Sequence, residues 1–337
     1  MVERSGLGID IKYEEDSVLG YKVVHPGDYV IHLRSFQGGF AFSEKTGICS
    51  PAYTILQPSS SLSYGFLKNY FVSKKFINSL RIVTYGIRDG KSISVEEWLK
   101  LSTCFPKSLE EQQRIKSFLS LLDKRITLQN KVIERYKSLI RAIIQDSQQK
   151  AATSVYLRDL LVERKELNTE GYQICSVSVS RGIINQIEYL GRSFAAKETG
   201  HYHVVRKGDI VYTKSPTGAF PYGIIKQSNL VFPVAVSPLY GVYEPITPEI
   251  GAYLHYYFCS PENTLNYLRK LIQKGAKNTI NITNNHFLDN SIRIPNSSEL
   301  RSSVAAIKSL SSRVEIETSS LRYLMLQRDY LLRHLFI

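Results

Sequence analysis

Three side chains near the middle of the chain could do metal chemistry. Asp159, Glu163 and Lys165 follow the order of two carboxylates and a lysine, the second pair spaced as ExK, with which many nucleases hold a metal ion. They fall on one segment that is expected to be helical, so a solvated charged face is the favoured interpretation. His201 and His203 alternate along the chain, but the seven histidines form no further ligand set. The sequence therefore predicts no metal site.

The motifs of several large enzyme classes are missing from the sequence. It contains no GxxxxGK[ST] phosphate loop, no Asn-Pro-Pro-aromatic motif of amino-methyltransferases, no HExxH and no GxSxG. We therefore expect no catalytic residue and no cofactor bound by this chain. The remaining possibility is that the chain binds a ligand without transforming it.

Polar, glycine-containing loops are the stretches best suited to bind a ligand. Two follow a Gly-Asp-strand signature, at 32–40 and 212–222, and two lie further on, at 85–92 and 274–285. Arg and Lys can bind phosphates or guanine, and Asn can bind the edge of adenine through two hydrogen bonds. Since polar turns are common everywhere, solvation is the simpler interpretation for any single residue. The candidate DNA-binding residues are Arg34, Ser35, Gln37, Arg88, Lys91, Lys214, Ser215, Thr217, Lys274, Lys277, Asn278, Asn281 and Asn284.

The charge of the chain favours a polyanionic partner. There are 43 Lys and Arg residues against 30 Asp and Glu, which gives a net charge of +13, and the excess is spread over both halves. Arg88 and Lys277 also keep a positive charge at one aligned position of otherwise dissimilar loops. Such a distribution is typical of a surface that faces nucleic acid, although a basic protein without such a partner would have the same composition.

A long helix between Pro106 and Gln145 is the element best able to position these loops. Ser108 is expected to cap its first turn while Glu111 reaches back. Apolar residues recur at alternating steps of three and four, the pattern of a coiled-coil seam. The predicted seam residues are Ile115, Phe118, Leu122, Ile126, Gln129, Ile133, Tyr136, Ile140 and Ile143.

A second helix of the same kind follows Pro295. Its polar seam residue, Glu317, aligns with Gln129 of the first helix, so the two helices are expected to pack on each other. A whole globular unit connects Gln145 to Glu299, and a compact unit joins these ends most easily if the helices run antiparallel. The predicted seam residues are Ile307, Leu310, Val314, Glu317, Leu321, Leu324, Arg328, Leu331 and Leu335. The candidate helix-pair or partner interface consists of Ile115, Phe118, Leu122, Ile126, Gln129, Ile133, Ile140, Ile307, Leu310, Val314, Glu317, Leu321 and Leu324.

The rest of the chain repeats as well. HPGDYV at 25–30 matches RKGDIV at 206–211, and the segment 86–98 matches 275–287. The predicted fold class is α+β, with two mixed α/β domains alternating with two long helices that pair as an antiparallel coiled coil. The expected segments are a first domain at 1–107, a helix and linker at 108–152, a second domain at 153–296 and a second helix at 297–337.

Coarse propensities suggest the elements of each domain. Helices are expected at 155–161, 64–72, 250–258 and 262–273, and strands at 172–179, 209–215 and 231–243.

About 26 residues near 153–178 have no counterpart in the first domain. Either the true start lies upstream, the gene is a rearranged fragment, or another chain supplies the missing strand.

Four scattered cysteines without CxxC spacing suggest a reducing compartment. No apolar run approaches the roughly 18 residues of a membrane span, and no signal peptide is evident at Met1. We therefore expect a cytoplasmic protein that does not bind a membrane.

The stretch PKSLEEQQRIKSFLSLLDKRI at 106–126 resembles the P-x-x-EQ-x-x-I-x-x-x-L-x-x-x-D helix of Type I restriction–modification specificity subunits. The GDYV and GDIV strands and the loops before each long helix also resemble the target-recognition domains of that family. The second helix is less similar, since Ser298, Glu299 and Leu300 replace the Leu-Glu-Glu run. The resemblance covers nearly the whole chain.

The resemblance implies a bacterial or archaeal, non-catalytic subunit that binds double-stranded DNA. Each target-recognition domain would read half of a bipartite site, and the helix pair would hold the domains apart. Two methyltransferase subunits would dock to the helices and bind S-adenosylmethionine, and restriction and translocase subunits would complete the assembly. The shortened first domain departs from the family pattern.

Two other interpretations remain open. The chain could be a scaffold whose helices assemble proteins and whose globular domains bind peptides. It could also be a fragment with one working DNA-reading domain. Two protected DNA patches with a fixed gap between them would distinguish the first interpretation from the scaffold.

Overall fold

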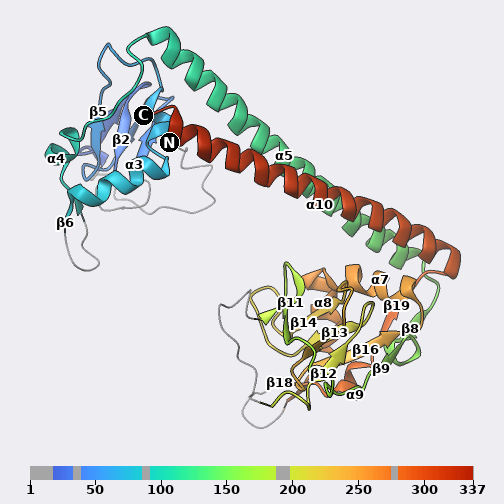
Figure 1. Ribbon diagram of the computed structural model, residues 1–337. Helices are drawn as coiled ribbons and strands as arrows, with labels where there is room; N and C mark the ends of the chain where they lie inside the picture. Colours follow the sequence, from blue (N-terminus) through green and yellow to red (C-terminus); the bar gives the residue numbers. More distant parts are fainter. Residues whose placement is uncertain (1–17, 33–38, 86–91, 187–197, 275–279, 337) are drawn as a thin grey trace. The chain divides into compact units, whose positions relative to one another are not determined.

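The computed structural model describes residues 18–32, 39–85, 92–186, 198–274 and 280–336 (Figure 1). The chain divides into two compact units. Unit 1 comprises Met1–Val132 and Glu317–Ile337, and unit 2 comprises Ile133–Ile316. Each unit therefore contains one globular part and one half of each long helix.

Unit 2 is built on a four-stranded antiparallel sheet. Its central strand β13 (Ile210–Thr213) pairs with β14 (Ile224–Gln227) on one side and with β16 (Gly241–Pro245) on the other. β9 (Leu161–Glu163) adds the outer strand next to β16. Every residue of β13 is buried, as expected of a strand covered on both faces.

Short paired strands surround this sheet. The pairs are β10 (Cys175–Ser178) with β11 (Gly182–Asn185), β12 (His203–Val205) with β15 (Val234–Val236), β17 (Gln273–Lys274) with β18 (Ile280–Asn281), and β8 (Ser154–Tyr156) with β19 (Ser291–Arg293).

Helices and aromatic rings fill the core of unit 2. α7 (Pro248–Phe258) and α8 (Pro261–Arg269) each begin at a hydroxyl cap, Thr247 and Ser260, followed by a proline in the first turn. α9 (Asn284–Phe287) carries Phe287, whose ring stacks on Tyr212 at 4.7 Å and on Tyr243 at 4.9 Å between centroids.

Unit 1 repeats this plan in a smaller form. β2 (Tyr29–Ile31) lies between β3 (Phe40–Phe42) and β5 (Thr54–Leu56), and β1 (Lys22–Val24) pairs with β4 (Gly47–Cys49). These five strands correspond in order and pairing to β12–β16 of unit 2. Then come α2 (Leu67–Tyr70), α3 (Lys74–Ser79), the 3-10 turn η2 (Leu80–Val83), the pair β6 (Thr84–Tyr85) with β7 (Ser92–Ile93), and α4 (Val95–Leu99).

The two long helices are α5 (Leu109–Lys150) and α10 (Ser297–His334). The Oγ of Ser108 accepts the N–H of Glu111 at 3.4 Å, so the predicted cap of the first helix is confirmed. α10 is capped by Asn296, whose Oδ1 accepts the N–H of Glu299 at 3.1 Å.

The helix halves run antiparallel within each unit (Figure 1). In unit 1, Arg328 pairs with Asp123 and Glu317 accepts a hydrogen bond from Gln129, so residue numbers fall along one helix as they rise along the other. In unit 2, Lys150 lies close enough to Glu299 for their charges to interact. The predicted α+β fold class with an antiparallel pair of long helices is confirmed.

One predicted helix is wrong. Residues 155–161 form the end of β8, the 3-10 turn η3 (Leu157–Asp159) and the start of β9. The reason is pairing with distant strands: β8 pairs with β19, about 140 residues later, and β9 pairs with β16, about 80 residues later. The helix predicted at 64–72 is shorter than expected and covers only α2.

None of the helices in the described ranges is long and apolar enough to span a membrane.

Candidate nucleic-acid interface

The repeated Gly-Asp pairs form turns that position the loops which follow them. Gly27 and Gly208 have φ of 103° and 95°, which is the left-handed region that favours glycine. The buried Asp28 accepts the N–H of His25 at 2.7 Å, and the buried Asp209 accepts that of Arg206 at 2.8 Å. These turns lead directly into the central strands β2 and β13, so the Gly-Asp signature is structural.

Unit 2 adds an ion pair to its Gly-Asp turn. Arg164, just after β9, donates to both carboxylate oxygens of Asp209, at 2.7 and 3.0 Å. The bidentate geometry ties the outer strand β9 to the start of β13. Arg206 in turn donates twice to Glu166, at 2.9 and 2.7 Å.

The loop after β13 contains three candidate residues. Ser215 and Thr217 are exposed, whereas Lys214 is half-buried. Thr217 and Phe220 bond each other through their backbones at 3.0 and 2.6 Å, which closes a tight turn that the buried Phe220 ring anchors. The loop is therefore held in a defined conformation by its own backbone.

Glu163 brings two candidate residues together. Asn284 donates its side-chain N–H to the Oε1 of Glu163 at 2.9 Å. Burial lowers the pKa of Lys214, and the nearby Glu163 carboxylate opposes that shift. Lys214 and Asn284, 70 residues apart in the sequence, are thus both within the influence of one acidic side chain at the end of β9, Asn284 through a hydrogen bond and Lys214 through charge.

In the sequence, Glu163 stands out only as part of a nuclease-like triplet with Asp159 and Lys165. The described residues contain no group of three or more His, Cys, Asp and Glu side chains that could hold a metal ion. The Nζ of Lys165 lies 4.0 Å from the Oε2 of Glu163. The Nδ1 of His203 lies 3.0 Å from the backbone oxygen of Tyr240, so this ring nitrogen already has a hydrogen-bond partner in the protein.

Two further candidate residues lie in the strands of a short hairpin. Lys274 ends β17 and Asn281 lies in β18, the two strands that flank one tip. The equivalent hairpin of unit 1 is β6–β7, and the remaining loop joins β2 to β3. Seven candidates lie outside the described residues: Arg34, Ser35, Gln37, Arg88, Lys91, Lys277 and Asn278.

The predicted helix seam is placed as follows. Buried members are Leu122, Ile133, Ile307 and Leu324; half-buried members are Ile115, Ile126, Gln129, Tyr136, Ile140, Ile143, Leu310, Val314, Glu317, Leu321, Arg328, Leu331 and Leu335.

Phe118 is a correction to the seam. Its side chain is 49% exposed, and Leu119, at 1%, takes the inward position. The seam therefore runs from Ile115 to Leu119 and on to Leu122, in steps of four and then three residues. The predicted order was three and then four. The α-helical period of 3.6 residues permits either order, and packing against Leu332 and Phe336 in the core of unit 1 selects Leu119.

Sequence reasoning missed a second apolar stripe on each long helix. On α5, Leu121, Leu128, Val132 and Leu139 are exposed; on α10, Ile316, Tyr323 and Tyr330 are exposed at seven-residue intervals. We name these residues the outer stripes. Their signal was present in the sequence as a second heptad pattern, beside that of the seam. Exposed apolar rows of this kind favour a protein partner.

Two solved structures have a similar fold. The S subunit of the Type I restriction–modification system from M. genitalium matches with a TM-score of 0.58 and 14% identity, over 93% of this chain and 83% of that one. A chain from a structure of complex assembly and conformational transition in the type I R-M system matches with a TM-score of 0.51 and 15% identity, over 93% and 82% of the two chains. No family model and no curated protein sequence matches this chain.

Proposed function

We propose that this chain, whose fold is that of a Type I restriction–modification S subunit, is the sequence-specific DNA-binding subunit of such a system. The observation that carries the proposal is the duplication: the same order of strands, hairpin and helix occurs in both units, and each copy leads into one long helix. Two equivalent modules suit a DNA site with two half-sites. The net charge of +13 supports a polyanionic ligand.

In this proposal each unit reads one half-site. The loop after the central strand and the hairpin before the long helix supply the contacts, with Lys214, Ser215 and Thr217 in unit 2 at the first of these positions. Two weakly binding modules gain affinity when one chain links them, because the second contact becomes intramolecular.

Catalysis would belong to partner subunits. We propose that two methyltransferase subunits bind the helix pair and carry S-adenosylmethionine, and that restriction and translocase subunits join them. The outer stripes of α5 and α10 support a docking role for the helices.

Selection from a randomised DNA pool tests the proposal. The purified chain with its methyltransferase subunits should enrich sequences with two fixed blocks separated by a gap of constant length, and footprinting should protect both blocks. Enrichment of one block would favour a chain with one working DNA-reading unit. Absence of any enrichment would contradict the proposal.

We expect the salt dependence of DNA binding to fall when a phosphate-binding charge is removed. Replacing Arg88 or Lys277 by Ala should each reduce the slope of log affinity against log salt by roughly one unit. The slope is measured by fluorescence anisotropy at salt concentrations from about 50 to about 300 mM. Lys150→Ala is the control, since Lys150 is already paired with Asp146 at 2.7 Å. Unchanged slopes in both variants would remove these residues from the interface.

We also expect charge on the outer stripe to block docking of the methyltransferase subunit. Leu121→Asp or Leu128→Asp should each weaken that binding by about 30-fold, because a carboxylate must be desolvated at an apolar contact. Calorimetry with the purified partner measures the affinity. Ser120→Asp, with the same added charge on a different exposed face of α5, should bind as the unchanged chain does. Equal affinities for all variants would exclude the stripe as the docking site.

A further inference from the structure

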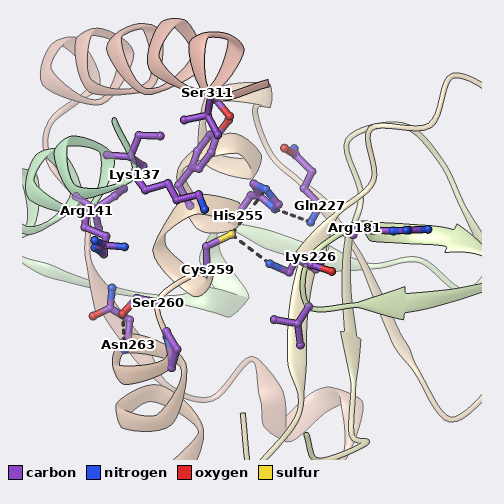
Figure 2. A pocket seen from close by; sticks show the side chains of 18 of the residues that line it. Lys137, Arg141, Arg181, Lys226, Gln227, His255, Cys259, Ser260, Asn263 and Ser311 are labelled. Carbon is purple, nitrogen blue, oxygen red and sulfur yellow. Dashed lines mark hydrogen bonds between the residues drawn. The ribbon is translucent and has the colours of Figure 1, made fainter. Parts of the chain in front are cut away.

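A cavity of about 760 Å³ lies within unit 2 (Figure 2). It is bounded by the end of α7, the start of α8, β14, the β10–β11 turn and the halves of α5 and α10 that belong to this unit. Its volume falls in the range of small-molecule sites, roughly 300–1,000 Å³. The cavity is distinct from the loops that we propose to read DNA.

The charged residues that line the cavity are mostly cationic. Lys137 and Arg141 come from α5, Arg181 from the β10–β11 turn and Lys226 from β14, whereas Glu262 of α8 is the one acidic lining residue of the described chain. The lining residues of α10, Ser311 and Val314, are uncharged. The cavity therefore favours an anionic ligand.

A cysteine sits in the wall of this cavity. Cys259 caps the C-terminus of α7 and is exposed. The Nζ of Lys226 donates to its Sγ at 3.3 Å, and the Nε2 of His255, one helical turn earlier, lies 3.8 Å from the same sulfur. Figure 2 shows the sulfur between these two side chains.

The hydrogen bonds of His255 orient its ring toward the sulfur. Its Nδ1 accepts the backbone N–H of Gln227 at 3.1 Å. A neutral imidazole that accepts at Nδ1 carries its proton on Nε2, the nitrogen that faces Cys259. Both neighbours of the sulfur are therefore hydrogen-bond donors, and this arrangement stabilises a thiolate.

Lys226 needs a negative charge beside it. Its side chain is only 5% exposed, and within the described ranges the acceptor of its ammonium is the Cys259 sulfur, with no carboxylate in an ion pair with it. A buried ammonium without a counter-ion is costly, and the Cys259 thiolate is the group in position to supply the charge. Although part of Cys259 is exposed, desolvation of its sulfur raises the pKa; the hydrogen bonds from His255 and Lys226 and the positive charge of Lys226 outweigh this effect, so that the pKa falls to about 7.

We propose that Cys259 is a modification site for anionic low-molecular-weight disulfides of the glutathione disulfide class. The thiolate Sγ attacks one sulfur of the disulfide, the new Sγ–S bond forms and the original S–S bond breaks. The leaving sulfur departs with the electron pair as a thiolate and takes a proton from water. Cys259 is oxidised to a mixed disulfide as the incoming disulfide is reduced, so no further oxidant is needed.

The cationic lining explains the choice of an anionic disulfide. The carboxylates of a peptide disulfide would lie in a lining that contains Arg141, which is exposed, and Lys137, which is also paired with Glu134 at 2.9 Å. A cationic disulfide such as cystamine would meet the same charges with repulsion. The exchange is reversible by any reducing thiol, so the modification responds to the thiol–disulfide balance around the protein.

Reaction of the full chain with oxidised glutathione tests the proposal. Site-resolved mass spectrometry should find Cys259 modified about tenfold faster than the exposed Cys104 near pH 7, with a half-maximal rate at a pH of about 7. Relative to Cys104, glutathione disulfide should be preferred over cystamine at Cys259. Modification of Cys259 no faster than Cys104 would overturn the thiolate site, and a preference for cystamine would overturn the anionic ligand class.

Two variants separate the contributions of charge and sulfur chemistry. Lys226→Met should slow the reaction at Cys259 and move its half-maximal rate to higher pH. Arg141→Gln, which changes an exposed side chain away from the sulfur, should keep that pH dependence and lower the preference for glutathione disulfide over cystamine. If Lys226→Met fails to fold, the Arg141→Gln result alone still decides: an unchanged reagent preference contradicts the cavity as the binding site.

Discussion

Replacing Gln112 by Leu is expected to destabilise unit 1 by about 3 kcal/mol. Gln112 lies in the first turns of α5 and is 0% exposed. Its Oε1 accepts the N–H of Ser63 at 2.7 Å, and its Nε2 donates to the backbone oxygens of Ser61 at 2.9 Å and Pro106 at 2.8 Å. Leucine fills a similar volume but leaves the three backbone groups without this partner, at about 1 kcal/mol each.

The neighbouring glutamine provides a matched control. Gln113 is exposed on the same turn, so Gln113→Leu should change stability by less than about 0.5 kcal/mol. Urea unfolding measures the change, and hydrogen exchange of the amides around Ser63 assigns it to unit 1. If both variants had equal stability, the hydrogen bonds of Gln112 would not hold the loop before α2 to the start of α5.

Gln112 also illustrates what a hydrophobic pattern cannot predict. The seam was predicted to begin at Ile115, because the periodicity counts apolar residues alone. The structure extends the buried face one turn further, through a polar side chain whose every group is paired with backbone. The P-x-x-EQ motif includes a glutamine, but the motif gives no physical reason for it.

The duplication was predictable because it rests on local signals. A Gly-Asp turn before a β-branched strand and a long heptad pattern survive in the sequence where most other residues differ. The structure extends the match to the pairing of each strand, with β2 and β13 both central in their sheets. The internal repeat in the sequence thus predicted the topology better than propensity did.

Strands that pair over long distances were not predictable. β8 and β9 are three residues each, and their segment reads as a helix when considered alone. Their counterparts are missing from the described sheet of unit 1, where β5 has one partner, β2, and no strand equivalent to β9. The stretch near 153–178 that has no match in the first half contains both of these strands.

The candidate site was predictable to the level of loops. The sequence indicated which turns follow the central strands, but not that Glu163 would bind Asn284 and lie beside Lys214. That contact depends on β9 joining the sheet next to β16, a pairing that no periodic pattern encodes. Asn284 therefore uses one of its donors within the protein before any ligand arrives.

A polar pair, Gln129 and Glu317, lies in the middle of the seam. Gln129 donates to the carboxylate of Glu317 and, at 3.2 Å, to its backbone oxygen, and both side chains are half-buried in unit 1. We expect Gln129→Leu alone to destabilise unit 1 by about 1–3 kcal/mol, because the Glu317 carboxylate then faces an apolar side chain without its donor. Replacing both residues by Leu should instead make unit 1 about 1–2 kcal/mol more stable than the unchanged chain.

The sign change between single and double replacement identifies the role of the pair. Polar seam residues reduce stability but fix the register of paired helices, and here the nearby Asp123–Arg328 ion pair holds the same register. A double-mutant cycle in urea measures the coupling, with Lys131→Leu, an exposed position of α5, as the control for added apolar surface. A double variant less stable than either single one would mean that the pair is a net source of stability. The alternative result has two parts: the double variant gains stability, and disulfides can be trapped in it between helix positions that are one turn out of register. That result would mean that the pair fixes the register of the helices and adds no net stability.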